Sequence, residues 1–107
     1  MTLKHISVAE LLIDIEAELR AMQLWEFEQP SLAALSSTEP FAIDTLTFPQ
    51  WLQFIFLPRM YQLVDAKAPL PAACGIKPMA EQYFYSFNVH SGSLILHLEK
   101  IDALLSE

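Results

Sequence analysis

Apolar side chains recur at three- and four-residue steps near the start of the chain, which is typical of one face of an amphipathic helix. This stripe consists of Val8, Leu11, Leu12, Ile15, Leu19 and Met22. Ser7 followed by Glu10 is the pattern of a capping box, so we expect the helix to begin near Val8. Glu10, Asp14 and Glu18 share another face, which we interpret as solvated, a docking face for a basic partner being the alternative.

The following stretch, residues 23–48, is a connection that cannot be one long helix, because Pro30 and Pro40 interrupt it. A short helical piece is expected around Ser31–Leu35. The connection nevertheless carries large apolar side chains, namely Trp25, Phe27, Phe41, Ile43, Leu46 and Phe48. We therefore predict that it wraps on the core instead of extending into solvent.

A second long helix is predicted from about Phe48 to Asp65 and is apolar nearly all round, so it is expected to be central or to form an interface. Thr47 and Gln50 form a second candidate capping box at its start. Pro58 falls inside this helix and removes one backbone hydrogen bond, so a kink or a local widening is expected there.

Two further helices complete the pattern. Pro78 can open a third, which we expect to end near Asn88, and Ser91 or Ser93 can cap a fourth. No stretch has the alternation typical of a strand. The sequence therefore predicts an all-α fold, a compact antiparallel bundle of four principal helices with a long wrapped connection between the first and the second. At 107 residues, the chain is expected to form a single domain over residues 1–107.

Charge, cysteine content and the length of apolar runs indicate which partners and which cellular location to expect. Thirteen acidic residues against six basic ones give a net charge of −7, which disfavours direct binding of nucleic acid phosphates. Cys74 is the single cysteine, and no signal-peptide pattern is evident, so a reducing cytoplasm is the expected location. The longest strongly apolar run without charge, residues 45–58, is shorter than the roughly 20 residues of a membrane-spanning helix, so no span is expected. The six basic residues are scattered and form no basic amphipathic helix, so no membrane association is expected either.

The common catalytic patterns do not occur in the sequence. Neither the Glu-x-x-His step of di-iron bundles nor an HExxH motif is present, and Cys74 has no thiol or imidazole neighbours at ligand spacing. There is no G-x-S-x-G elbow, and two glycines cannot supply a phosphate-binding loop. We therefore expect a protein that is not an enzyme and that has no metal or cofactor.

Arg59 is the most informative charged residue, because it follows Pro58 in an otherwise apolar helix. A buried guanidinium needs a partner to offset desolvation, and Asp44 is the candidate. One interpretation is an Arg59–Asp44 clamp that ties the connection to the central helix. The other is an arginine that binds an anion or a ligand.

A specific string of residues resembles a known family. Its segments are Ser37-Thr38-Glu39-Pro40-Phe41, Asp44-Thr45, Trp51-Leu52-Gln53-Phe54, Leu57-Pro58-Arg59-Met60 and Leu70-Pro71. This string resembles the YqcC-like family of small bacterial proteins of unknown function. The resemblance implies an all-helical bundle and a bacterial cytoplasmic setting, and it implies no activity. It also implies an association with a tRNA pseudouridine synthase, and hence an accessory role in tRNA modification.

Two hypotheses for function follow. The first is a non-enzymatic protein–protein interaction module, with a protein partner such as an RNA-modifying enzyme, or with self-association. The apolar excess without catalytic parts motivates it. The second is a small-molecule-binding protein or an unrecognised enzyme with a polar crevice near Asp44, Gln53 and Arg59. The residues of the expected interaction or ligand surface are Phe41, Asp44, Trp51, Gln53 and Arg59.

Overall fold

The computed structural model describes residues 3–72, 75–85 and 92–106, and this part of the chain contains helices and no strand. The first principal helix is α1 (Leu3–Ala21), and the second is a continuous unit of α3 (Phe48–Trp51), η2 (Leu52–Phe56) and α4 (Leu57–Asp65). The others are α5 (Ile76–Tyr85) and α6 (Gly92–Leu105). The short elements α2 (Leu32–Leu35) and η1 (Pro40–Ala42) lie in the connection between α1 and α3. The predicted all-α bundle is confirmed.

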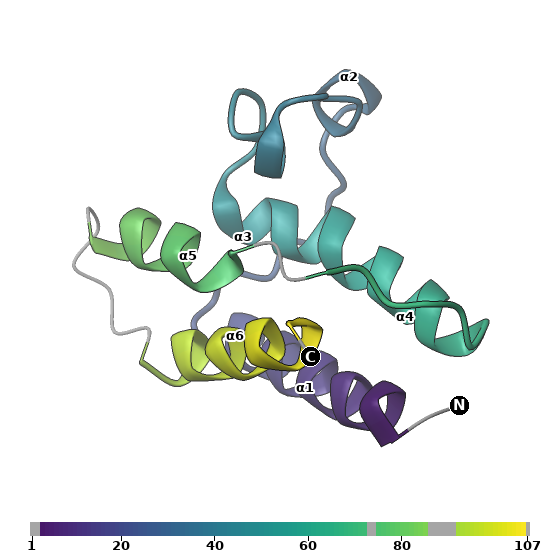
Figure 1. Ribbon diagram of the computed structural model, residues 1–107. Helices are drawn as coiled ribbons and strands as arrows, with labels where there is room; N and C mark the ends of the chain where they lie inside the picture. Colours follow the sequence, from purple (N-terminus) through teal and green to yellow (C-terminus); the bar gives the residue numbers. More distant parts are fainter. Residues whose placement is uncertain (1–2, 73–74, 86–91, 107) are drawn as a thin grey trace.

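One hydrophobic core joins the principal helices. The predicted stripe on α1 places Val8, Leu12, Ile15 and Leu19 in the core with no exposed surface. α1 packs against α4 and α6, while α5 packs against α6 and α3. In Figure 1, α1 lies beside α6 and runs antiparallel to both α6 and α4. Burying each of these aliphatic side chains contributes about 1.5–3 kcal/mol, so the periodic stripes account for the bundle.

The predicted start of the first helix is wrong, because α1 is already helical at Leu3 and Ser7 lies inside it. The reason is a contact with a distant part of the chain. His5 is buried, and its Nε2 atom lies 2.7 Å from the carbonyl oxygen of Ala68, just beyond the end of α4. A local capping pattern carries no information about such a contact.

The second principal helix has the predicted bounds and the predicted widening. At its start, the Thr47 hydroxyl accepts a hydrogen bond from the Gln50 backbone N–H, and the Gln50 side chain accepts one from the Thr47 N–H. Directly before Pro58, η2 is a π-helical segment, in which the Leu57 N–H donates to the Leu52 carbonyl. Pro58 has no N–H to donate to the carbonyl four residues earlier, so the widened turn accommodates it without ending the helix.

A side chain from α6 caps the start of α5. The Asp102 carboxylate accepts hydrogen bonds from the backbone N–H groups of Ile76 at 3.1 Å and Lys77 at 2.8 Å. α5 therefore begins at Ile76, two residues before the predicted opening at Pro78. Ser93 lies within α6 and does not cap it, whereas the predicted end near Asn88 and the alternative cap Ser91 lie outside the described residues.

Asp102 is predicted to stabilise the fold as a cap supplied by another helix. Asp102→Ala removes the acceptor of two backbone N–H groups and should lower the free energy of unfolding by about 1–2 kcal/mol, measured by urea denaturation. Glu99→Ala is the control, because Glu99 forms only an exposed ion pair with Lys77 and its loss should cost about 0.5 kcal/mol or less. Equal effects of the two substitutions would contradict the capping role.

Candidate functional site

The connection between α1 and α3 forms one wall of the candidate site. In Figure 1 it rises over α3 on the side away from α1 and α6. The predicted wrapping holds for Leu46 and Phe48, which are buried, and for Trp25 and Phe41, which pack against the core. It is wrong for Phe27 and Ile43, whose exposed fractions are 94% and 61%. The connection therefore covers the core with only part of its apolar surface.

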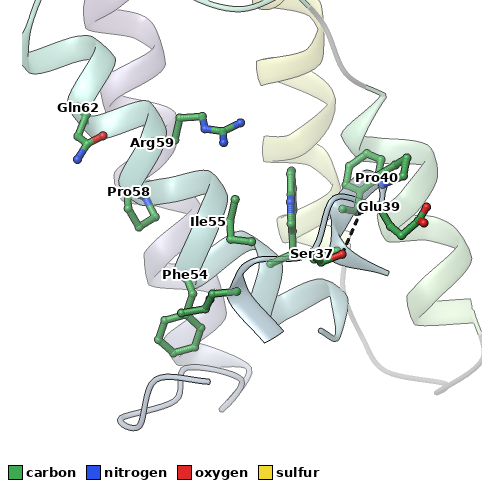
Figure 2. Close-up of a pocket in the computed structure, with 12 residues that line it drawn as sticks. Ser37, Glu39, Pro40, Phe54, Ile55, Pro58, Arg59 and Gln62 are labelled. Carbon is green, nitrogen blue, oxygen red and sulfur yellow. Dashed lines mark hydrogen bonds between the residues drawn. The ribbon is translucent and has the colours of Figure 1, made fainter. Parts of the chain in front are cut away.

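A cleft of about 750 Å³ lies between this connection and the second principal helix. Figure 2 shows its two sides. The helical side is lined by Trp51, Phe54, Ile55, Pro58, Arg59 and Gln62, and the facing side by Leu35, Ser37, Glu39, Pro40, Phe41 and Ala42. Most of these side chains are apolar, and the charged ones are Glu39 and Arg59. Its volume is in the range of binding clefts for drug-sized ligands or short peptide segments.

Aromatic rings build the end of the cleft where the two sides meet. The Phe41 ring packs edge-on against Trp51, with 4.7 Å between the ring centroids. Trp51 in turn stacks on Phe56, which is buried, at 5.3 Å. Since Phe41 and Trp51 also line the cleft, this aromatic contact joins the lining of the cleft directly to the core. A substitution at Trp51 would therefore disturb the stability of the fold as well as the shape of the cleft.

The backbone at the aromatic end of the cleft is strained. Phe41 and Ala42 have φ values of 57° and 48°, in the left-handed region that residues with a side chain rarely adopt. Such a conformation costs on the order of 1–2 kcal/mol per residue. It persists here because Ala42 is buried and the Phe41 ring is held against Trp51. Backbone strain of this kind occurs preferentially at functional sites.

Arg59 and Asp44 do not form the predicted clamp. Both residues are exposed, and the ion pairs within the described ranges do not include Arg59. Asp44 instead accepts a hydrogen bond of 2.5 Å from the Ser37 hydroxyl, which also accepts one from the Glu39 N–H at 3.1 Å. Exposure removes the desolvation penalty that would have required a partner for the guanidinium. In Figure 2, Arg59 extends from α4 toward the segment that carries Ser37 and Pro40.

Gln53 anchors the connection through hydrogen bonds and does not line the cleft. It is buried, and its amide makes two hydrogen bonds to the backbone of Glu26. Its Oε1 accepts from the Glu26 N–H at 2.9 Å, and its Nε2 donates to the Glu26 carbonyl at 2.6 Å. Gln53 is therefore a structural residue, and the expected polar crevice of Asp44, Gln53 and Arg59 does not form.

The structure thus places Phe41, Trp51 and Arg59 in one cleft. Asp44 and Gln53 instead form hydrogen bonds that hold the connection, which is one wall of the cleft. The sequence interpretation missed Phe54, Ile55 and Gln62. A signal for Ile55 and Gln62 was present, because Trp51, Ile55, Pro58 and Gln62 are spaced by four, three and four residues, as on one helix face. The all-round apolar composition of the helix obscured that face.

Three further features of the described residues concern metal binding, the ionisation of Tyr61 and membrane spanning. No group of three or more His, Cys, Asp or Glu side chains in residues 3–72, 75–85 and 92–106 is arranged to hold a metal ion. Burial raises the pKa of Tyr61 above its usual value of 10.0, and the negative charge of Glu16 raises it further. Tyr61 is therefore neutral near pH 7. None of the described helices is long and apolar enough to cross a membrane.

These features define a small helical bundle with an open, largely apolar cleft beside a π-helical segment. Residues 7–104 match the family described as tRNA pseudouridine synthase C (DUF446), and the chain belongs to this family. The uncharacterised protein YqcC of Escherichia coli is 36% identical over 103 residues, which are 96% of this chain and 94% of that protein. Its solution NMR structure has a TM-score of 0.84 at 35% identity, covering 99% of this chain and 91% of that one.

A second kind of relative is much longer. A protein of Pectobacterium carotovorum named tRNA pseudouridine synthase C is 45% identical over 64 residues, which are 60% of this chain but only 17% of that protein.

An uncharacterised protein of Haemophilus influenzae is 35% identical over 74 residues, covering 69% of this chain and 70% of that one. The predicted YqcC-like family is confirmed, and its members include uncharacterised proteins.

Gln53 is predicted to be the main polar anchor of the connection. Gln53→Leu leaves the Glu26 N–H and carbonyl without their protein partner and should lower the free energy of unfolding by about 1–3 kcal/mol. Limited proteolysis should then cleave within residues 22–47 faster than in the wild type. Gln62→Leu is the control, because Gln62 is exposed on the same helix. If both variants keep wild-type stability and resistance to proteolysis, the anchoring role is wrong.

Proposed function

We propose that this chain is a non-enzymatic interaction module whose cleft binds a segment of a protein partner. The cleft of about 750 Å³ between α4 and the connection carries the proposal, because it is preformed and mostly apolar. At its aromatic end, the contact between Phe41 and Trp51 holds the backbone of Phe41 in its left-handed conformation. A preformed apolar surface loses little conformational entropy on binding, so it favours a docking role.

The enzyme alternative has less support from the geometry. It depends on polar groups that converge on one crevice, and Asp44 and Gln53 instead bond to Ser37 and Glu26. Glu39 and Arg59 are the charged residues of the cleft, and they lie on facing sides. In Figure 2 the Glu39 carboxylate points away from Arg59. A pair in this arrangement is poorly placed for acid–base chemistry on a single bound group.

The class of partner that we propose is a tRNA pseudouridine synthase. Support comes from the longer Pectobacterium relative, in which a segment similar to this chain belongs to a protein named tRNA pseudouridine synthase C. Similarity to one part of a larger protein is expected when the module acts beside the remainder of that protein. The net charge of −7 favours binding to the synthase over direct binding to tRNA.

The test combines the purified chain with the tRNA pseudouridine synthase C of the same organism and measures their complex by light scattering and calorimetry. We expect a stable complex, and we expect Ile55→Ser to weaken it at least about tenfold by removing an apolar contact in the cleft. Ile13→Ser is the matched control, because Ile13 is 61% exposed on α1 and does not line the cleft. Circular dichroism checks that both variants fold.

The other outcomes are informative. Absence of any complex with the synthase would contradict the proposal. If the chain instead dimerises and Ile55→Ser abolishes the dimer, self-association is the function of the cleft. Tight binding of a small metabolite, with no protein partner, would favour the ligand-binding alternative.

A further inference from the structure

Arg59 stands out among the residues of the cleft because it is charged and takes part in none of the ion pairs of the described residues. It is exposed on α4, and the described ion pairs are Glu16–Arg20, Lys77–Glu99 and Glu18–His97. Asp44, the acid expected to pair with it, is hydrogen-bonded to Ser37. In a chain with thirteen acidic and six basic residues, an arginine at a cleft wall that forms no ion pair with a described carboxylate is a feature that a partner can use.

The surroundings of Arg59 restrict what it binds. Pro58 precedes it, and Ile55 and Phe54 lie on the same wall, so the guanidinium borders apolar surface. A guanidinium pairs best with planar oxygen anions, which it binds through two parallel hydrogen bonds. A phosphate of RNA is the less favourable anion here, because the net charge of −7 repels a polyanion more strongly than a single carboxylate.

We infer that the cleft recognises a peptide segment in which an aspartate or glutamate side chain pairs with Arg59 while neighbouring large apolar side chains pack on Ile55, Phe54 and the Phe41–Trp51 pair. The occupant is a segment of a protein partner, and its assignment to the synthase rests on the function proposed above. The apolar contacts supply most of the affinity. The carboxylate sets the register of the segment and excludes segments with a basic residue at that position.

The inference can be tested without the synthase. The full chain is immobilised and used to select from a displayed library of random-sequence peptides, and the enriched peptides are synthesised. We expect them to carry Asp or Glu close to Leu, Phe or Trp. Enrichment of peptides without a carboxylate, or no enrichment above the bare support, would overturn the inference.

A double-mutant cycle then links the carboxylate to Arg59. Changing the acidic residue of the selected peptide to its amide should weaken binding to the wild type about tenfold, and Arg59→Gln should weaken binding of the original peptide by the same factor. The amide peptide should bind the wild type and Arg59→Gln equally. Lys67→Gln is the matched control, because Lys67 is also exposed, just beyond the end of α4, and does not line the cleft. Independent, additive effects would contradict the pairing.

The same variants separate this inference from the proposed function. If peptides behave as described but the synthase does not bind, the partner is a different protein and the inference stands. If the synthase binds the wild type and Arg59→Gln with equal affinity, the proposed function stands and the inference is wrong.

Discussion

Pro58 has no backbone N–H, and the central helix has to continue through it. The helix does so by widening into the π-helical segment Leu52–Phe56, in which the Leu57 N–H reaches back to the Leu52 carbonyl. The residues in and directly after this widened turn face both the core and the cleft. Phe56 and Leu57 are both buried although they are consecutive, while Phe54 and Ile55 are left on the wall of the cleft. The widened segment therefore carries core residues and cleft residues side by side.

The opposite wall consists of irregular chain with the short elements α2 and η1, and tertiary contacts hold it in place. Gln53 fixes the backbone of Glu26, the Thr45 hydroxyl donates to the Ala34 carbonyl at 2.7 Å, and Ser37 bonds to Asp44. These contacts, together with the aromatic packing of Phe41, offset the cost of its left-handed backbone. A wall built in this way is preformed, which is the property that a docking surface needs.

Periodic features were predictable from the sequence, and features that depend on distant contacts were not. The buried stripe of α1, the Thr47–Gln50 capping box and the widening before Pro58 each follow from residues close together in the chain. The early start of α1 depends on the contact between the His5 ring and the Ala68 carbonyl oxygen. The start of α5 depends on the Asp102 carboxylate, which accepts a hydrogen bond from the Ile76 N–H. The same limit applied to the site. Phe41, Trp51 and Arg59 line one cleft in the structure, whereas the hydrogen-bond partners of Asp44 and Gln53 could not be read from sequence spacing.

The central claim is that the cleft beside the π-helical segment is the surface on which this chain meets its partner. The most direct measurement is an NMR titration of the isotope-labelled chain with the unlabelled synthase, following backbone amides and the Arg59 side chain. The account predicts that shift changes and line broadening concentrate on residues 35–42 and 51–62. Changes that concentrate on the exposed face of α1 and α6, with the cleft resonances unchanged, would contradict it.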